Sequence, residues 1–147
     1  MSSLFLFRGT TVGFKGNKAA ISIPYTSTST HPVKALWFGL ECLPRNPGNA
    51  VIYLANMENL AHLKTMRNCL ASVEDELAFG IRPEKFYPFC EGYVHVTEMQ
   101  EVLRSFGIDG YQIVTRNNIT SHCETTQTLS RGTIDLIVAE MRKKLRK

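Results

Sequence analysis

The sequence lacks any long hydrophobic segment and any cysteine spacing typical of a metal or redox site. No stretch approaches the ~20 apolar residues that a membrane helix needs, so we expect no membrane association. The four cysteines, Cys42, Cys69, Cys90 and Cys123, lie far apart, without a Cys-x-x-Cys pair and without a histidine at ligand spacing. This excludes the usual zinc and dithiol motifs, and we interpret the cysteines as buried free thiols.

A leader, a repeat and a linker are also missing. The first eight residues have no basic leader, and their apolar run is too short for a signal peptide. We therefore expect a cytoplasmic protein, acting in the cytoplasm of a target cell if it is delivered there. With 147 residues, 44% of them hydrophobic and 20% charged, the chain has the length and composition of a single domain, 1–147.

The positive charge is concentrated at the C-terminus. The formal net charge is +4, but five basic residues occupy the last six positions: Arg142, Lys143, Lys144, Arg146 and Lys147. The rest of the chain is nearly neutral, which weakens the case for a nucleic-acid surface spread over the whole protein. Apolar residues at helical spacing predict a basic amphipathic helix at about residues 133–147.

The pattern of apolar residues and turn residues predicts mixed secondary structure. Thr30 and Pro32 are typical of a helix start, with Thr30 as the N-cap. Predicted strands cover residues 4–7, 21–26, 50–55, 77–79, 92–96 and 111–115, and predicted helices cover 33–40, 57–69, 97–106 and 133–145. Because strands and helices do not alternate regularly, we predict an α+β fold of small antiparallel sheets with helices to one side.

Two short motifs place polar side chains at strand ends. Arg8 and Gly9 follow an apolar run at residues 4–7. Burying a guanidinium without an anion is costly, so Arg8 either binds an anion or reaches out to water. The second motif is Ser27-Thr28-Ser29, which either builds a site or is an exposed polar strand.

A pair of glutamates two residues apart, Glu74 and Glu76, opens a predicted strand. Such residues project to the same side of an extended segment. Breaking a ribose glycosidic bond develops positive charge on the sugar, which a fixed carboxylate stabilises. The second carboxylate would serve the incoming nucleophile. The alternative interpretation is a solvated acidic turn.

These motifs occur in the order found in one enzyme family. The strand ending in Arg8-Gly9, the Ser27-Thr28-Ser29 strand start and the Glu74-x-Glu76 strand start resemble the arginine-serine-glutamate class of NAD-dependent ADP-ribosyltransferases. The resemblance covers roughly residues 4–115. It implies an ADP-ribosyltransferase-like fold, with two small packed antiparallel sheets, flanking helices and a central NAD cleft. It also implies NAD as a substrate and no metal.

The resemblance implies a role for each matching residue. Arg8 holds the phosphate and ribose region of NAD, and the backbone of Gly9 bonds the nicotinamide amide, a close approach that a residue without a side chain suits. Ser27 bonds Glu76 and steadies the nicotinamide ribose. Thr28 and Ser29 hold the strand in place.

Three further positions take roles from the same resemblance. Glu76 is the catalytic glutamate, which bonds the ribose 2′-hydroxyl, and Glu74 is the acidic residue that accompanies arginine acceptors. Phe38 stands near the nicotinamide unless it belongs to the core. Arg45, in the next loop, meets a phosphate unless it is solvated. Pro83 arrives soon after Glu76, which departs from the family and predicts trimmed final strands.

The resemblance predicts a mono-ADP-ribosyltransferase of the bacterial or phage toxin or effector kind, which modifies protein arginine and releases nicotinamide. An antitoxin or immunity protein is the partner that such a toxin implies. The basic C-terminus leaves nucleic acid, RNA or DNA, as an alternative acceptor. A non-catalytic interaction module and an NAD hydrolase of the same fold are further alternatives.

Overall fold

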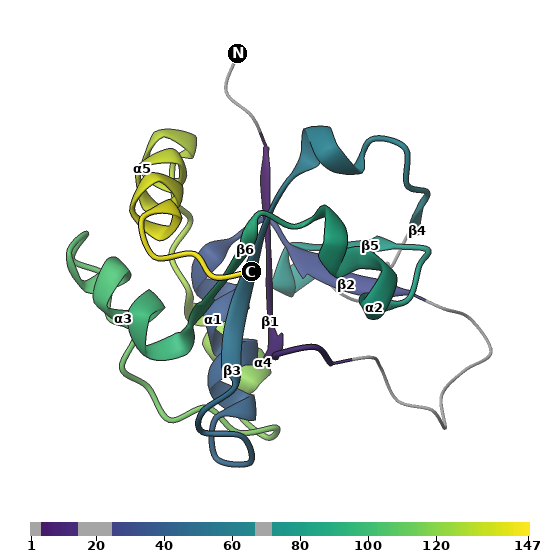
Figure 1. Ribbon diagram of the computed structural model, residues 1–147. Helices are drawn as coiled ribbons and strands as arrows, with labels where there is room; N and C mark the ends of the chain where they lie inside the picture. Colours follow the sequence, from purple (N-terminus) through teal and green to yellow (C-terminus); the bar gives the residue numbers. More distant parts are fainter. Residues whose placement is uncertain (1–3, 15–24, 67–71) are drawn as a thin grey trace.

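A single antiparallel sheet joins all the strands in the computed structural model, which describes residues 4–14, 25–66 and 72–147 (Figure 1). The sheet has six strands in the order β4-β5-β2-β1-β3-β6. The strands are β1 (Phe5–Thr11), β2 (Thr26–Ser29), β3 (Ala50–Asn56), β4 (Thr65–Met66), β5 (Glu76–Phe79) and β6 (Gly92–His95).

Five α-helices accompany the sheet in the described residues, which confirms the predicted α+β class. They are α1 (Pro32–Cys42), α2 (Pro83–Phe86), α3 (Val96–Arg104), α4 (Ile119–Thr125) and α5 (Arg131–Arg142). The described residues also contain three 3₁₀ helices: η2 (Met57–Leu60), η3 (Ser72–Glu74) and η4 (Tyr87–Phe89).

The sheet has two halves that meet at one residue pair. Strands β1 and β3 pair over seven residues, whereas the described ladder between β1 and β2 has the single pair Phe7 with Ser29. In Figure 1, β1 and β3 run down the view and β2 and β5 run across it. The predicted second sheet is therefore not found in the described residues, where β6, β3 and β1 form one half of the sheet and β2, β5 and β4 the other.

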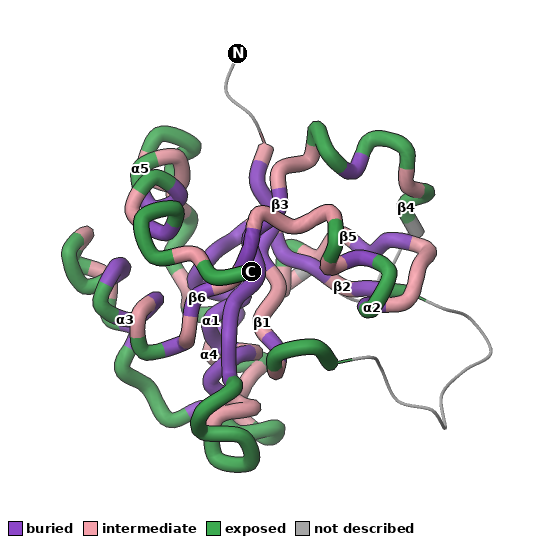
Figure 2. Tube along the Cα trace, viewed as in Figure 1, coloured by how far each residue is buried: buried purple, intermediate pink, exposed green. Residues whose placement is uncertain are grey.

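In the half made of β6, β3 and β1, residues 50–55 of β3 and 5–7 of β1 are apolar and buried on both faces (Figure 2), whereas Arg8 of β1 and Tyr93 and His95 of β6 are half-buried. Phe7 packs into a large cluster with side chains of α1, α3 and α5, and Leu6 packs into a smaller cluster with Phe79 and Phe86 on the other side. Successive strand residues point to opposite faces, so a continuous apolar run suits a strand that is covered twice. The predicted burial on both faces is confirmed for residues 5–7, and the predicted strand at residues 50–55 is confirmed as β3.

Helix α1 lies very close to β1 because Gly9 faces the backbone of the helix at Ala35 and Gly39. A Cβ atom on Gly9 would lie 1.9 Å from the carbonyl oxygen of Ala35 and 2.5 Å from the amide nitrogen of Gly39. Only a residue without a side chain fits there. The absence of a side chain at Gly9 thus has a packing reason, which the sequence analysis assigned to ligand approach alone.

Several local predictions were wrong because distant or capping contacts decided the conformation. Residues 57–66 form η2, a turn and β4 rather than a helix, and the Asn56 side chain caps η2 by accepting from Glu58 N at 3.0 Å. The end of that predicted helix, residues 67–69, lies outside the described residues, as do residues 21–24 of the predicted strand at 21–26. The segment 111–115 is not a strand, and the Asn118 side chain bonds its backbone at Ile113 and Thr115.

The start of α1 and the end of the C-terminal helix also differ from the predictions. His31, not Thr30, caps α1, because its side chain accepts a hydrogen bond from Val33 N. The C-terminal helix ends at Arg142, and the chain after it turns back so that Arg146 pairs with Tyr93 of β6. The basic residues after Arg142 therefore lie beyond the helix that the sequence predicted for them.

The cysteine prediction is only partly right. Cys42, Cys90 and Cys123 are free thiols, but Cys42 and Cys90 are half-buried and only Cys123 is fully buried among these three; Cys69 lies outside the described residues. Burial raises the pKa of the Cys90 thiol to about 12, so it is protonated and a poor nucleophile at neutral pH. No helix in the described part of the chain is long and apolar enough to cross a membrane.

Candidate functional site

A pocket of about 340 Å³ opens where β1 and β2 separate. It is bounded by both strands, by α1 and by the turn that precedes β5. The lining residues are Phe7, Arg8, Gly9, Tyr25, Ser27, Thr28, Ser29, Ala35, Phe38, Glu74 and Glu76. The structure thus brings together every site residue predicted from the sequence except Arg45.

The pocket exists because the ladder between β1 and β2 stops after Phe7 and Ser29. Continuing that antiparallel register would pair Gly9 with Ser27. Instead the Arg8 guanidinium takes the place of a backbone donor: its Nη1 donates to the Ser27 carbonyl at 2.8 Å. Strand β1 does not end at Arg8, as the sequence predicted, but pairs with β3 as far as Thr11. The Arg8 side chain, in the middle of this strand, bonds the Ser27 carbonyl across the gap in the sheet.

Arg8 is half-buried and held at two points. Besides the bond to Ser27, its Nε lies 3.4 Å from the Tyr87 hydroxyl, which donates to the Phe14 carbonyl at 2.8 Å. Both partners of the guanidinium are neutral oxygens, so these contacts do not neutralise its charge. The arrangement leaves a fixed positive charge at the pocket, which suits an anionic group.

Ser27 and Glu76 lie diagonally across the ladder between β2 and β5. Ser29 lies opposite Glu76 in the register, and Ser27 lies opposite Ala78. The Ser27 hydroxyl donates a hydrogen bond to the Glu76 carboxylate. The contact that the resemblance implied between these two residues is thus present in the structure, and it orients one oxygen of Glu76.

Glu74 and Glu76 are not part of one extended segment, contrary to the prediction. Glu74 ends η3, Asp75 has a left-handed backbone with φ of 50°, and Glu76 begins β5. Both carboxylates still line the pocket because the turn at Asp75 brings them to the same side. Burial, and then the charge of Glu76, raise the pKa of Glu74 above its ordinary value.

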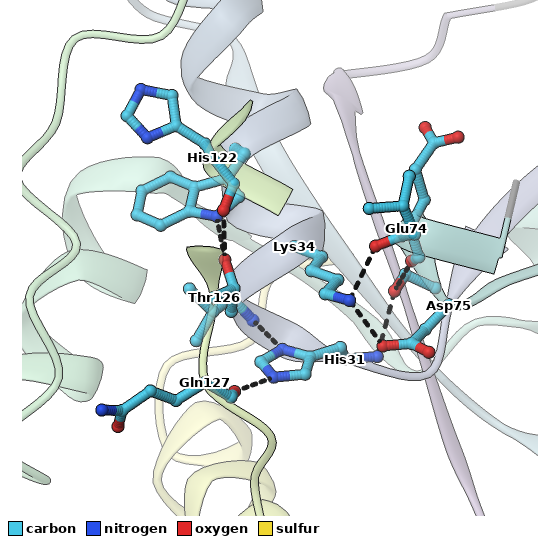
Figure 3. Close-up of polar contacts among 11 residues, drawn as sticks. His31, Lys34, Glu74, Asp75, His122, Thr126 and Gln127 are labelled. Carbon is cyan, nitrogen blue, oxygen red and sulfur yellow. Dashed lines mark hydrogen bonds and ion pairs between the residues drawn. The ribbon is translucent and has the colours of Figure 1, made fainter. Parts of the chain in front are cut away.

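The turn before β5 is held by residues that the sequence analysis did not select. Lys34 of α1 forms an ion pair with Asp75 at 2.9 Å and donates to the Val73 carbonyl at 2.7 Å (Figure 3). Figure 3 shows the Asp75 carboxylate turned toward Lys34 and the Glu74 carboxylate turned away from it. One signal was present: a lysine inside a helix that is otherwise apolar at residues 33–40.

The remaining predicted residues divide into structural and exposed positions. The Thr28 hydroxyl donates to the Leu77 carbonyl at 2.6 Å, which ties β2 to β5. Phe38 lines the pocket and also packs against the main core, and its place near a nicotinamide stays a prediction. Arg45 is exposed, binds Glu41 with both guanidinium nitrogens at 2.9 and 3.1 Å, and lies outside the pocket lining.

His31 connects the start of α1 to the segment after α4. Its Nδ1 accepts from Val33 N, which assigns the proton to Nε2, 2.8 Å from the Gln127 carbonyl (Figure 3). Burial is the main cause that lowers the pKa of His31. The residue is 5% exposed, so His31 is a buried cap of α1.

The chain was compared with protein-family models, with curated proteins and with solved structures. None of them matches. In the described residues, no group of three or more histidine, cysteine, aspartate or glutamate side chains is arranged to hold a metal ion. The pocket offers one arginine, two carboxylates and an apolar wall formed by Phe7, Ala35 and Phe38.

Proposed function

We propose that the protein is an NAD-dependent mono-ADP-ribosyltransferase that modifies protein arginine and releases nicotinamide. One observation carries the proposal: a serine of one strand orients a glutamate of the next, in a pocket that also presents Arg8 and Glu74. The resemblance in sequence and this geometry point to the same residues. The sheet whose two halves meet at one pair, with the pocket between them, supports an ADP-ribosyltransferase-like fold.

The proposed reaction breaks the bond between nicotinamide and ribose C1′. The bonding electrons leave with nicotinamide, which becomes neutral, and positive charge develops on the ribose. Glu76 stabilises that charge, held in place by Ser27. The acceptor guanidinium gives a proton to Glu74, and its nitrogen then forms the new bond to C1′. If water replaces the acceptor, the product is ADP-ribose.

The pocket suits the nicotinamide and ribose end of NAD. Its volume of about 340 Å³ is at the lower end of the range for small-ligand pockets. Arg8 supplies a cation for the pyrophosphate, and the Phe38 ring supplies an apolar contact for nicotinamide. The backbone of Gly9 remains available to the nicotinamide amide, because Gly9 lines the pocket.

A nucleic-acid acceptor receives less support from the basic C-terminus. Arg142 binds Glu91 with two nitrogens at 2.8 Å, Lys143 binds Glu140, and Arg146 binds Glu98. These cations are engaged with acidic groups of the protein, so fewer of them are available for phosphates. We therefore keep protein arginine as the proposed acceptor.

The decisive experiment incubates the protein with NAD labelled in its ADP-ribose part and with cell lysate, followed by separate digestion with protease and nuclease. Label that is removed by protease identifies a protein acceptor, and label removed by nuclease identifies RNA or DNA. Glu76→Gln should lower both transfer and nicotinamide release by about two orders of magnitude, since it removes the charge that stabilises the ribosyl cation.

Two variants test the parts of the proposal separately. Arg8→Ala should weaken NAD binding, whereas Arg131→Ala, which removes an exposed arginine on α5, should not. Glu74→Gln should abolish transfer and spare nicotinamide release. Absence of NAD binding by the wild-type protein would leave the interaction module as the better description.

Expression in bacteria should be toxic for the wild-type chain and tolerated for Glu76→Gln, as a toxin or effector requires. An antitoxin or immunity protein would suppress that toxicity.

A further inference from the structure

We propose that Lys34 is a positioning residue for the acceptor step, because it clamps the turn that presents Glu74 to the pocket. This inference rests on the proposed function for its effect on activity. The clamp itself is a property of the structure. Lys34 lies on α1, outside the pocket lining, and acts through the backbone of Val73 and the side chain of Asp75.

Three successive backbone carbonyls of the turn each accept a hydrogen bond from residues 29–34, which run from the end of β2 into α1. Lys34 Nζ donates to the Val73 carbonyl at 2.7 Å. The Ser29 hydroxyl donates to the Glu74 carbonyl at 2.7 Å, and Thr30 N donates to the Asp75 carbonyl at 3.1 Å. The turn is therefore fixed by groups far from it in sequence, and Lys34 is the only one of the three that supplies a charge.

The turn needs such an anchor because its backbone conformation is uncommon. Asp75 has φ of 50°, a left-handed conformation that residues other than glycine seldom adopt. Its carboxylate, 2.9 Å from Lys34 Nζ, holds the residue in that conformation. The Lys34 side chain is 11% exposed, so its ammonium depends on these oxygens in place of water.

The clamp acts on Glu74 more than on Glu76. Glu76 lies in the ladder between β2 and β5, opposite Ser29, and it is bonded by Ser27. Glu74 precedes the ladder, and its position depends on the turn. Loss of Lys34 should therefore reduce transfer to arginine more than release of nicotinamide to water.

The test uses the full chain with Lys34→Met, Asp75→Asn and the double variant, and with Lys85→Met as the control for an exposed lysine. Transfer to arginine should fall about 10- to 100-fold in Lys34→Met, the range expected for a misplaced catalytic group, while nicotinamide release falls less. Lys85→Met should match the wild type. Asp75→Asn should also lower transfer, because it removes the carboxylate that Lys34 holds.

The double variant separates positioning from simple stability. It removes both charges and so leaves no half-buried ammonium without its partner, and its melting temperature should recover toward that of the wild type. Transfer should stay low, because the Val73 carbonyl has lost its donor. Recovery of transfer together with the melting temperature would overturn the positioning role.

A measurement without activity tests the clamp even if the proposed function fails. The Thr30 amide donates to the Asp75 carbonyl, so its hydrogen exchange reports whether the turn is in place. Exchange of this amide should be faster in Lys34→Met than in the wild type and unchanged in Lys85→Met. An unchanged rate in Lys34→Met would overturn the clamp, whereas loss of all NAD chemistry in the wild type would overturn only the proposed function.

Discussion

The two halves of the sheet are held together by different forces. In the apolar half, β1 and β3 pair over seven residues, and side chains such as Leu6, Ile52 and Leu54 are completely buried. In the other half, β2 is a run of serine and threonine whose hydroxyls bond carbonyls and a carboxylate. The first half obtains its stability from burial, and the second obtains its geometry from hydrogen bonds.

This difference explains where the pocket lies. Apolar burial is not directional and tolerates few gaps, so the first half forms a closed scaffold. Hydrogen bonds between side chains and backbone are directional, and they can fix polar groups around an open space. We therefore expect substitutions in the first half to change the free energy of unfolding and substitutions in the second to change the geometry of the site.

The largest effect is expected for Gly9→Ala, which adds a methyl group between β1 and α1. Because the obstacle is the backbone at Ala35 and Gly39, relaxation requires the helix to move. The free energy of unfolding should fall by about 3 kcal/mol or more, measured by urea unfolding. Gly48→Ala is the control, since nothing lies within 4 Å of its added Cβ. Equal stability of the two variants would contradict the close packing.

Ser29→Ala should have an intermediate effect in the polar half. Its hydroxyl donates to the Glu74 carbonyl and accepts from His31 N at 3.0 Å, and the residue is 4% exposed. Leaving these groups unpaired should cost about 2 kcal/mol in unfolding free energy. Ser121→Ala, at an exposed position of α4, should stay within about 0.5 kcal/mol of the wild type. An effect of Ser29→Ala on stability but not on transfer would remove Ser29 from the turn's support.

A smaller effect should appear as a pH dependence at His31. The pKa of His31 is lower in the folded state than in the unfolded state. The neutral ring therefore contributes to the free energy of unfolding above the unfolded-state pKa, and this contribution is lost as the pH falls through the folded-state value. Between pH 7 and 5 the loss should be about 1 kcal/mol, the usual size of a helix N-cap. His31→Asn, which can also cap α1, should show a weaker dependence in thermal unfolding over the same range.

The smallest effect on stability is expected at Glu74, which is only half-buried. The pKa of Glu74 is raised in the folded state. Its contribution to the free energy of unfolding is therefore present below the unfolded-state pKa and is lost as the pH rises through the folded-state value. Glu74→Gln should therefore gain stability relative to the wild type as the pH rises. The rate of transfer has the opposite pH dependence, because Glu74 must be ionised to accept the proton. As the solution is acidified, the rate should begin to fall at a higher pH than it would for an ordinary glutamate. A transfer profile like that of an ordinary glutamate would contradict the raised pKa.

The sequence by itself determined the elements whose cause is local. A continuous apolar run at residues 4–7 can only be satisfied by burial on both faces, and residues 97–106 carry enough helical periodicity to predict α3 nearly to its ends. The residue types of the candidate site were also visible, because an arginine after an apolar run and two glutamates before one are unusual in any strand. Each motif alone also fitted a solvated strand end or turn, and the site residues were selected by the order of the three motifs, which resembles one enzyme family.

Only the tertiary structure decided how these pieces meet. The separation of β1 from β2 after Phe7 depends on the Arg8 guanidinium reaching Ser27, and the turn at Asp75 depends on Lys34, which is 41 residues earlier in the chain. Arg45 remained outside the pocket because Glu41, one helical turn before it, binds it. The Arg45 pair is local, but the contacts of Arg8 and Lys34 join residues that are far apart in the chain. Their distances are set by the whole fold, and local residue patterns do not contain those distances.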